Sequence, residues 1–486
     1  MIAMFVARLL INDEALDASD ASTFECIDPA TGDVATIAPA ASLADATSAA
    51  NAAAAAFPAW SEIGPSQRRA LLNKAANILA ARTADFVEAM VGETGATALW
   101  ARINCDLAID ILRETGAMTT QVAGEIIPSS EAGSLAMAVR QAAGVCLGIA
   151  PWNAPIILGV RAIAMPLACG NTVILKASEL CPKTHCLIGE IMREAGFPAG
   201  VVNVVTNAPK DAAAIVEALI AHPAVRRINF TGSTRVGRLI AEASARHLKR
   251  CLLELGGKAP FIVLADADID EAVRAAAFGA FMNQGQICMS TERIILMDEI
   301  ADEFVEKLRA KAEALVAGNP RDGNTPLGTM ITAEAARRVR ALVEDASQKG
   351  AVVVCGGHAR GTLIDATVID HVTPAMRIYR EESFGPLAAI IRVDSIDEAV
   401  TVANDNEYGL SSAVFSRDIN RALAVARRIE TGICHINEAT VADEPQMPFG
   451  GVKSSGYGRF GGRAAIDEFT ELRWITLASG RRNYPI

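Results

Sequence analysis

The chain of 486 residues is too long for one simple hydrophobic core, so two or three packed domains are expected. Hydrophobic residues make up 51% of the chain and charged residues 21%, which is the composition of an ordinary globular protein. The 56 acidic and 45 basic residues give a net charge of −11, and this balance argues against a nucleic-acid-binding surface, which would need a basic field.

The first 82 residues are predicted to hold one strand and two helices. Residues 1–13 contain a single arginine and a short apolar stretch, without a basic leader or a small-residue cleavage site, which indicates a strand rather than a signal peptide. Apolar residues at helical spacing predict helices over 42–56 and 66–82. The uncharged segment 141–160 could suggest a membrane span, but its prolines and glycines would leave backbone groups unsatisfied in lipid. We therefore expect a cytoplasmic protein without membrane contact.

Two later blocks alternate short apolar strands with helices, which is typical of a doubly wound parallel sheet. In the first block the predicted strands are 145–149, 172–175, 201–205, 227–231 and 252–255, and the predicted helices are 185–195, 211–221 and 236–246. In the second block the predicted strands include 261–264, 293–297, 387–393 and 433–437. Two α/β blocks predict two domains with a ligand-binding cleft between them.

The ten cysteines are scattered and include no CxxC pair, so neither a metal site nor a redox dithiol is expected. Cys288 is the candidate nucleophile, because it lies in a polar turn with a glycine that follows an apolar helical run over 275–282. A thiol whose surroundings favour the thiolate can form a thioester with an acyl group. The alternative is a buried structural cysteine, since free cysteines usually belong to the core.

Glu254 and Asn153 are candidates for the two other catalytic functions. Glu254 follows an apolar pair at a predicted strand end and precedes two glycines, so its carboxylate could act as a general base near a ligand. Asn153 lies between two prolines, where a rigid amide donor would suit a developing oxyanion. An ion-paired glutamate and an Asx turn are the respective structural alternatives.

A nucleotide site is indicated by two segments of the first block. Lys176 and Glu179 follow a predicted strand, at the position where a doubly wound fold binds a ribose. The strand-to-helix turn over 230–237 offers backbone N–H groups and Ser233 to a phosphate. This turn is neither a GxGxxG nor a Walker A motif, and a plain helix N-cap at Ser233 explains it about as well.

These segments occur together and in order, and the chain resembles the aldehyde dehydrogenase superfamily from about residue 24 to its C-terminal region. The spacing between Glu254 and Cys288 also matches that family. The matching motifs are Pro151-Trp152-Asn153, Lys176-x-x-Glu179, Phe230-Thr231-Gly232-Ser233, Glu254-Leu255-Gly256-Gly257-Lys258, Gly285-Gln286-x-Cys288, Glu382-x-Phe384-Gly385-Pro386 and Pro448-Phe449-Gly450-Gly451.

The resemblance implies oxidation of an aldehyde to a carboxylic acid by way of a cysteine thiohemiacetal and thioester. It implies that Cys288 is the nucleophile, that Glu254 activates water, and that the Asn153 amide and the Cys288 backbone N–H form the oxyanion hole. The implied cofactor contacts are Lys176 and Glu179 at the adenine-side ribose, Ser233 at the pyrophosphate, Glu382 at the other ribose and Phe384 near the nicotinamide, together with Trp152, Phe230, Gly232, Val236, Leu255 and Gly256.

The expected cofactor is NAD, because the negative charge of Glu179 would repel a 2′-phosphate. The loop 206–209 departs from the family pattern by lacking a customary glycine.

The implied fold is α/β, with a Rossmann-like NAD-binding domain over 1–121 and 142–255 and a catalytic domain over 256–455. A bridging element over 122–141 and 456–486 would mediate assembly into a homodimer or homotetramer.

Within the superfamily, the chain is most similar to aromatic aldehyde dehydrogenases of the vanillin and salicylaldehyde type. The similarity rests on the segments 133–137, 175–180, 286–293 and 456–460, and the small Ala154 should widen the substrate tunnel for a ring. The residues predicted to line an aryl pocket are Trp100, Leu158, Ile287, Met289 and Phe449. Arg161 could bind a ring hydroxyl or carboxylate, with a surface or interdomain ion pair as the alternative.

Two other functions are compatible with the same motifs. A CoA-acylating semialdehyde dehydrogenase would pass the acyl group to CoA, but the presence of Glu254 argues for water as the acceptor. A catalytically silent structural protein on the same fold is disfavoured by the joint presence of Cys288, Glu254 and Asn153.

Overall fold

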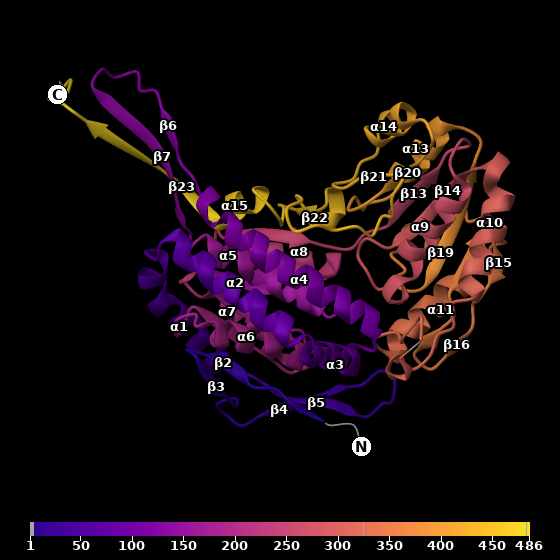
Figure 1. Ribbon diagram of the computed structural model, residues 1–486, viewed down its shortest axis with the longest axis horizontal. Coiled ribbons are helices and arrows are strands. Elements are labelled where there is room, and N and C mark those ends of the chain that lie inside the picture. The colour runs from indigo at the N-terminus through magenta and orange to yellow at the C-terminus, as the bar shows by residue number, and fades with distance from the viewer. Residues whose placement is uncertain (1–3, 324, 483) are drawn as a thin grey trace.

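The structure, a computed structural model, describes residues 4–323, 325–482 and 484–486. Figure 1 shows two α/β lobes, one built mainly from the first half of the chain and the other from the second, with a long β-arm projecting from the first lobe. The C-terminus lies at the tip of this arm, away from both lobes.

The first lobe is built on an eight-stranded sheet of order β22-β12-β11-β8-β9-β10-β2-β3. Its strands are β2 (Leu9–Ile11), β3 (Glu14–Leu16), β8 (Val145–Ile149), β9 (Thr172–Lys176), β10 (Val202–Val205), β11 (Val225–Thr231), β12 (Arg250–Glu254) and β22 (Gly456–Tyr457). The five strands from β8 to β12 pair in parallel, as the strand–helix alternation predicts.

Helices cover both faces of this sheet, because successive residues of a buried strand point to opposite sides. In β9, Val173 and Leu175 pack into one apolar cluster and Ile174 into another. One face carries α2 (Pro65–Ala81), α3 (Thr83–Thr94), α4 (Ala98–Met118), α5 (Pro155–Ala168) and α6 (Pro182–Ala195). The other carries α1 (Leu43–Ser61), α7 (Ala212–Ala221) and α8 (Thr234–Arg246).

The second lobe is built on a seven-stranded sheet of order β15-β18-β19-β14-β13-β20-β21. Its strands are β13 (Ala259–Val263), β14 (Thr291–Met297), β15 (Val352–Cys355), β18 (Thr367–Asp370), β19 (Leu387–Val393), β20 (Ala413–Phe415) and β21 (His435–Ile436). One face packs on α9 (Ile269–Phe281) and α10 (Asp298–Glu313), the other on α11 (Ala333–Gln348), α13 (Ile396–Asn404) and α14 (Ile419–Ala426).

The arm is an antiparallel sheet of β6 (Glu125–Ile127), β7 (Ser134–Ala142) and β23 (Thr470–Ala478). β7 and β23 pair along their whole length, from Thr470 opposite Ala142 to Ala478 opposite Ser134. A smaller sheet pairs β1 (Phe5–Val6), β5 (Val34–Pro39) and β4 (Thr23–Ile27). The remaining elements are η1 (Thr119–Gln121), η2 (Pro209–Asp211), η3 (Met282–Gly285), η4 (Pro320–Asp322), β16 (Ala359–Arg360), β17 (Leu363–Ile364), α12 (Arg377–Arg380), η5 (Lys453–Ser455) and α15 (Ala464–Phe469).

The predicted elements are present, with differences at their ends. The helix predicted over 185–195 begins three residues earlier, at Pro182, because a proline at the first helical position has the required φ and lacks only an unneeded donor. The strand predicted over 433–437 shortens to β21, which pairs only through His435 and Ile436 at the sheet edge. Among the described residues, no helix is both long and apolar enough to cross a bilayer.

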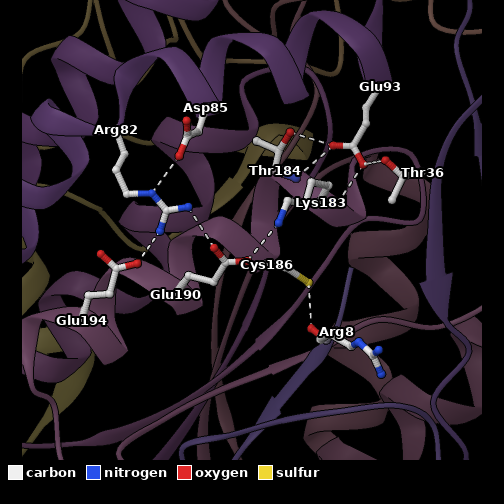
Figure 2. A network of polar contacts seen from close by, with 10 residues as sticks. All are labelled: Arg8, Thr36, Arg82, Asp85, Glu93, Lys183, Thr184, Cys186, Glu190 and Glu194. Carbon is white, nitrogen blue, oxygen red and sulfur yellow. Dashed lines mark hydrogen bonds and ion pairs between the residues drawn. The ribbon is translucent and has the colours of Figure 1, made fainter. Parts of the chain in front are cut away.

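A buried carboxylate joins α3 to the N-terminus of α6 (Figure 2). Glu93 is fully buried and accepts four hydrogen bonds of 2.7–2.9 Å, from the Thr36 hydroxyl, the Lys183 N–H, the Thr184 N–H and the Thr184 hydroxyl. It thereby satisfies helix N–H groups that have no partner within the helix. Nearby, Arg82 forms ion pairs with Glu190 and Glu194, both on α6.

Replacing this carboxylate by an amide should destabilise the first lobe. Glu93→Gln turns one acceptor oxygen into a donor that faces other donors, so we expect the free energy of unfolding to fall by about 2–4 kcal/mol. Thermal unfolding of Glu93→Gln and of Glu88→Gln, an exposed position on the same helix, provides the comparison. Equal midpoints for the two variants would contradict the role assigned to Glu93.

Candidate active site

Cys288 lies in a constrained loop between η3 and β14. Asn283 and Gln284 have left-handed backbones, with φ values of 50° and 56°, a conformation that is costly for residues with side chains. Side-chain amides hold the loop in place: Gln284 and Gln286 each donate to the Thr329 carbonyl, at 3.1 and 3.2 Å. The loop therefore presents the thiol on a rigid support.

Asn153 connects this loop to the first lobe. Its backbone carbonyl accepts hydrogen bonds from the Trp100 indole N–H at 2.9 Å and from the Asn283 side-chain amide at 3.1 Å. Its own side-chain amide donates to the Gln286 carbonyl at 3.1 Å. An amide nitrogen has two N–H groups, so one remains for a ligand oxygen beside Cys288.

Glu254 is the last residue of β12, as the sequence predicts for a strand end. Its side chain is 1% exposed, and neither carboxylate oxygen has a hydrogen-bond partner. Burial raises its pKa to about 7, and the neighbouring Cys288 thiol and Thr231 hydroxyl only partly offset this effect. A carboxyl group that titrates near neutral pH is suited to general-base catalysis.

The thiol of Cys288 is influenced by the same carboxylate. Burial raises the pKa of Cys288 well above its usual range, and the negative charge of Glu254 raises it further. A nucleophile and a potential base therefore lie together in a site of low polarity, where the negative charge of Glu254 favours the neutral thiol.

A cavity of about 750 Å³ opens next to Cys288 and Asn153. Its lining is mostly apolar and comes from α4, α5, the Cys288 loop and residues 432–449. All six residues predicted for the substrate pocket line it: Trp100, Leu158, Arg161, Ile287, Met289 and Phe449.

Arg161 makes the ion pair that the sequence left open as an alternative. Its guanidinium contacts the Asp443 carboxylate at 2.5 Å and lies 4.6 Å from the centre of the Phe449 ring. Both charged side chains are nearly buried, at 6% and 10% exposure. Recognition of a ring substituent by Arg161 stays a prediction.

The predicted nucleotide residues lie at the carboxyl ends of the central parallel strands. Lys176 ends β9 and forms an ion pair with Glu179, which also accepts a hydrogen bond from the Asn207 side chain at 2.9 Å. Phe230 lies near the end of β11, and Gly232 follows that strand at a point where a Cβ would be 2.4 Å from the Phe230 ring.

The helix that follows this turn begins with a side-chain cap. Ser233 is the N-cap of α8, and its hydroxyl accepts the Val236 N–H at 3.4 Å. The helix also packs closely on the segment after β12, because a Cβ at Gly237 would be 2.4 Å from Leu255. Apart from the capped Val236, the first backbone N–H groups of this 13-residue helix have no partner within the helix.

Glu382 and Phe384 reach the first lobe from the second. The Glu382 carboxylate accepts the Gly257 N–H at 3.0 Å, and a Cβ on Gly256 would lie 2.6 Å from it, so a larger residue at 256 would displace the carboxylate. Burial raises the pKa of Glu382 to about 7. The ring of Phe384 meets that of Trp152 edge to face, with centroids 5.7 Å apart.

Sequence reasoning missed the residues that hold the segment of Glu382 and Phe384 in place. Glu292, which is 4% exposed, pairs with the fully buried Lys258 at 2.6 Å. Its carboxylate also accepts the N–H groups of Ser383 and Phe384 at 2.9 and 3.1 Å. Lys258 lies in the motif 254–258 and Glu292 in the segment 286–293, but neither pattern indicates which buried charges form an ion pair.

Comparison with known proteins identifies the family. The model of the aldehyde dehydrogenase family matches residues 16–475. The chain belongs to the aldehyde dehydrogenase family.

Individual relatives of the chain match over nearly its whole length. The chain is 59% identical over 483 residues to a vanillin dehydrogenase of Pseudomonas fluorescens, covering 99% of this chain and 100% of the relative. It is 52% identical over 479 residues to a salicylaldehyde dehydrogenase of Pseudomonas sp. (strain C18), covering 98% and 99%.

A solved structure is similarly close. The salicylaldehyde dehydrogenase from Pseudomonas putida G7, solved in complex with salicylaldehyde, superimposes with a TM-score of 0.98 at 50% identity, covering 99% of this chain and 100% of that one. The mixed α/β fold is therefore that of aldehyde dehydrogenases, enzymes that use NAD(P) to oxidise aldehydes to acids.

The charge of Glu254 should suppress the reactivity of the free thiol. Because Glu254→Gln removes a negative charge beside Cys288, we expect the thiol pKa to fall and alkylation by iodoacetamide at pH 8 to accelerate by up to about tenfold per pKa unit. The rate is measured by mass spectrometry of the Cys288 peptide, with Glu438→Gln, at the exposed side of the same cavity, as control. Slower alkylation of Glu254→Gln would show instead that Glu254 deprotonates the thiol.

Proposed function

We propose that this enzyme oxidises an aromatic aldehyde to its carboxylic acid, with Cys288 as nucleophile, Asn153 as oxyanion donor and Glu254 as base. The observation that carries the proposal is that the thiol of Cys288 lines an apolar cavity together with the amide residue Asn153, and lies next to the buried carboxylate of Glu254. The names of the relatives, vanillin and salicylaldehyde dehydrogenase, support a ring-containing substrate.

The cavity supports the aromatic part of the proposal. Ala154, at the cavity wall beside Asn153, leaves space near the thiol that a larger side chain would occupy. Trp100, Leu158 and Phe449 offer flat or branched apolar surfaces, and burial of an aryl ring against them would be favourable.

The residues at the strand ends fit a dinucleotide. Ser233 and the start of α8 would hold a pyrophosphate, with Phe230, Gly232, Val236, Leu255 and Gly256 forming the surrounding surface. Lys176 and Glu179 would hold the adenine-side ribose, Glu382 the other ribose, and Trp152 and Phe384 would pack near the nicotinamide. NAD is preferred to NADP, because Glu179 would repel a 2′-phosphate.

The chemistry follows from these positions. The Cys288 thiolate adds to the aldehyde carbon, and the carbonyl oxygen gains a negative charge that the Asn153 amide and the Cys288 N–H stabilise. The bound cofactor supplies the acceptor for the hydride that leaves this carbon. The thioester that remains on Cys288 is hydrolysed by water, from which Glu254 takes a proton.

Water is preferred to CoA as the acceptor of the acyl group. A thiol such as CoA needs little help to attack a thioester, whereas water needs a base. Glu254, with a pKa raised to about 7, is such a base and lies beside the thiol. The joint presence of Cys288, Glu254 and Asn153 also disfavours a purely structural role.

The predicted domains and assembly are also part of the proposal. The two lobes suggest an NAD-binding domain over 1–121 and 142–255 and a catalytic domain over 256–455. The enzyme would act in the cytoplasm. The arm, whose strands β6, β7 and β23 come mostly from the bridging segments 122–141 and 456–486, exposes large apolar residues that a homodimer or homotetramer would bury. These residues are Ile126, Ile127, Leu135, Leu472, Trp474 and Leu477.

A substrate panel tests the main proposal. We expect reduction of NAD, followed at 340 nm, with benzaldehyde, vanillin and salicylaldehyde at higher kcat/KM than with acetaldehyde, and a lower value with NADP. Acid should form without CoA, and Cys288→Ser should lose at least about 10³-fold in kcat, because a serine hydroxyl is barely ionised in a buried site. Activity only with aliphatic aldehydes, or full activity of Cys288→Ser, would refute it.

The pH dependence of kcat tests whether Glu254 is the base. Because only ionised Glu254 can accept a proton, kcat should rise as the pH passes upward through about 7. Glu254→Gln should lose this rise and about 10²–10⁴-fold in kcat, while a first-turnover burst of NADH remains. A Glu254→Gln enzyme with an unchanged pH profile would place the base elsewhere.

A further inference from the structure

Arg68, on α2, is a buried cation without a partner. Its side chain is 9% exposed, and its Nε has no hydrogen-bond partner. None of the ion pairs found among the described residues includes it. Burial lowers the pKa of Arg68, and the neighbouring Cys169 opposes this effect in part.

Such an arrangement is unfavourable unless something else neutralises the charge. Removing a guanidinium from water costs several kcal/mol, and proteins normally offset this cost with a carboxylate or several hydrogen bonds. Arg82 and Arg161 in this chain follow that rule, with ion pairs of 2.5–2.9 Å. Arg68 is the exception that requires an explanation.

Arg68 lines a cavity of about 570 Å³ between α1, α2, η1 and the base of β7. Arg140, from β7, lines the same cavity and pairs with Asp467 at 2.5 Å. Hydroxyl groups are contributed by Ser61, Thr119 and Thr120, while one exposed carboxylate, that of Glu62, lies at the cavity wall.

A glycine keeps the guanidinium in this position. A Cβ at Gly170 would lie 2.3 Å from Nη1 of Arg68, and the φ of Gly170 is +88°. The cavity shares no lining residue with the one at Cys288, so it is a separate feature of the molecule.

We propose that this cavity binds a small oxyanion, a carboxylate or a phosphate, through the guanidinium of Arg68. A planar guanidinium can hold two oxygens of one such group by parallel hydrogen bonds. Arg140 adds positive potential at the other side. The proposal does not depend on the substrate or cofactor of the enzyme.

Anion-dependent stability tests the site. At constant ionic strength, replacing sodium chloride by sodium phosphate or sodium benzoate should raise the Tm of the wild-type protein by at least about 2 °C, because a ligand that binds only the folded state stabilises it. Phosphate and benzoate are tested separately, which distinguishes the two oxyanion classes. Benzoate bound near Cys288 would stabilise all variants equally.

Three variants assign the effect to Arg68. Arg68→Met should abolish the anion-dependent rise, Arg68→Lys should retain part of it, and Arg113→Met, at an exposed arginine paired with Asp110, should behave as wild type. Wild-type protein that shows no rise beyond chloride, or an Arg68→Met variant with the full rise, would overturn the proposal.

A direct measurement covers the case in which Arg68→Met does not fold. Wild-type crystals soaked in selenate should show an anomalous peak within hydrogen-bond distance of the Arg68 guanidinium. A cavity filled instead by a side chain of a neighbouring subunit would also overturn the proposal.

Discussion

The backbone carbonyl of Asn153 joins the two lobes at the reacting centre. It accepts one hydrogen bond from Trp100, in the first lobe, and one from Asn283, in the loop that carries Cys288. The side-chain amide of the same residue returns a hydrogen bond to the Gln286 carbonyl. These buried bonds hold the loop that carries the thiol against the Asn153 amide. Every other part of the site is arranged around this junction.

The strained Cys288 loop is stable only because of such contacts. Two successive left-handed residues with side chains cost of order 1–3 kcal/mol each, and Gly285 relieves the strain at a third position, where a Cβ would collide with the Gly385 carbonyl at 2.0 Å. The amides of Gln284 and Gln286 offset this cost by binding the backbone of residues 328–331. Residues 283–286 therefore fix the geometry of the loop, while the candidate nucleophile is Cys288, two residues later.

The parallel sheets were predictable because their strands are buried on both faces. Continuous apolar runs such as 172–175 and 387–393 alternate with amphipathic helices, and this pattern has few structural solutions. The candidate catalytic residues could be named because three short motifs stand in a fixed order. Contacts between distant charged residues could not be predicted in this way. Nothing in the local sequence pairs Lys258 with Glu292 or Arg161 with Asp443, since each pair depends on how separate segments pack.

The Arg161–Asp443 pair shows why such contacts matter to the chemistry. Among the groups that act on Glu254, Arg161 lowers its pKa and Asp443 raises it, so the pair as a whole has a smaller effect than either charge alone. An ion pair in an apolar cavity can thus be present without greatly changing the pKa of Glu254. Removal of Asp443 alone would leave Arg161 as an unopposed positive charge, which would favour ionised Glu254 and lower its pKa. The ion pair and Glu254 are therefore electrostatically coupled, and a substitution at Arg161 or Asp443 also changes the pKa of Glu254.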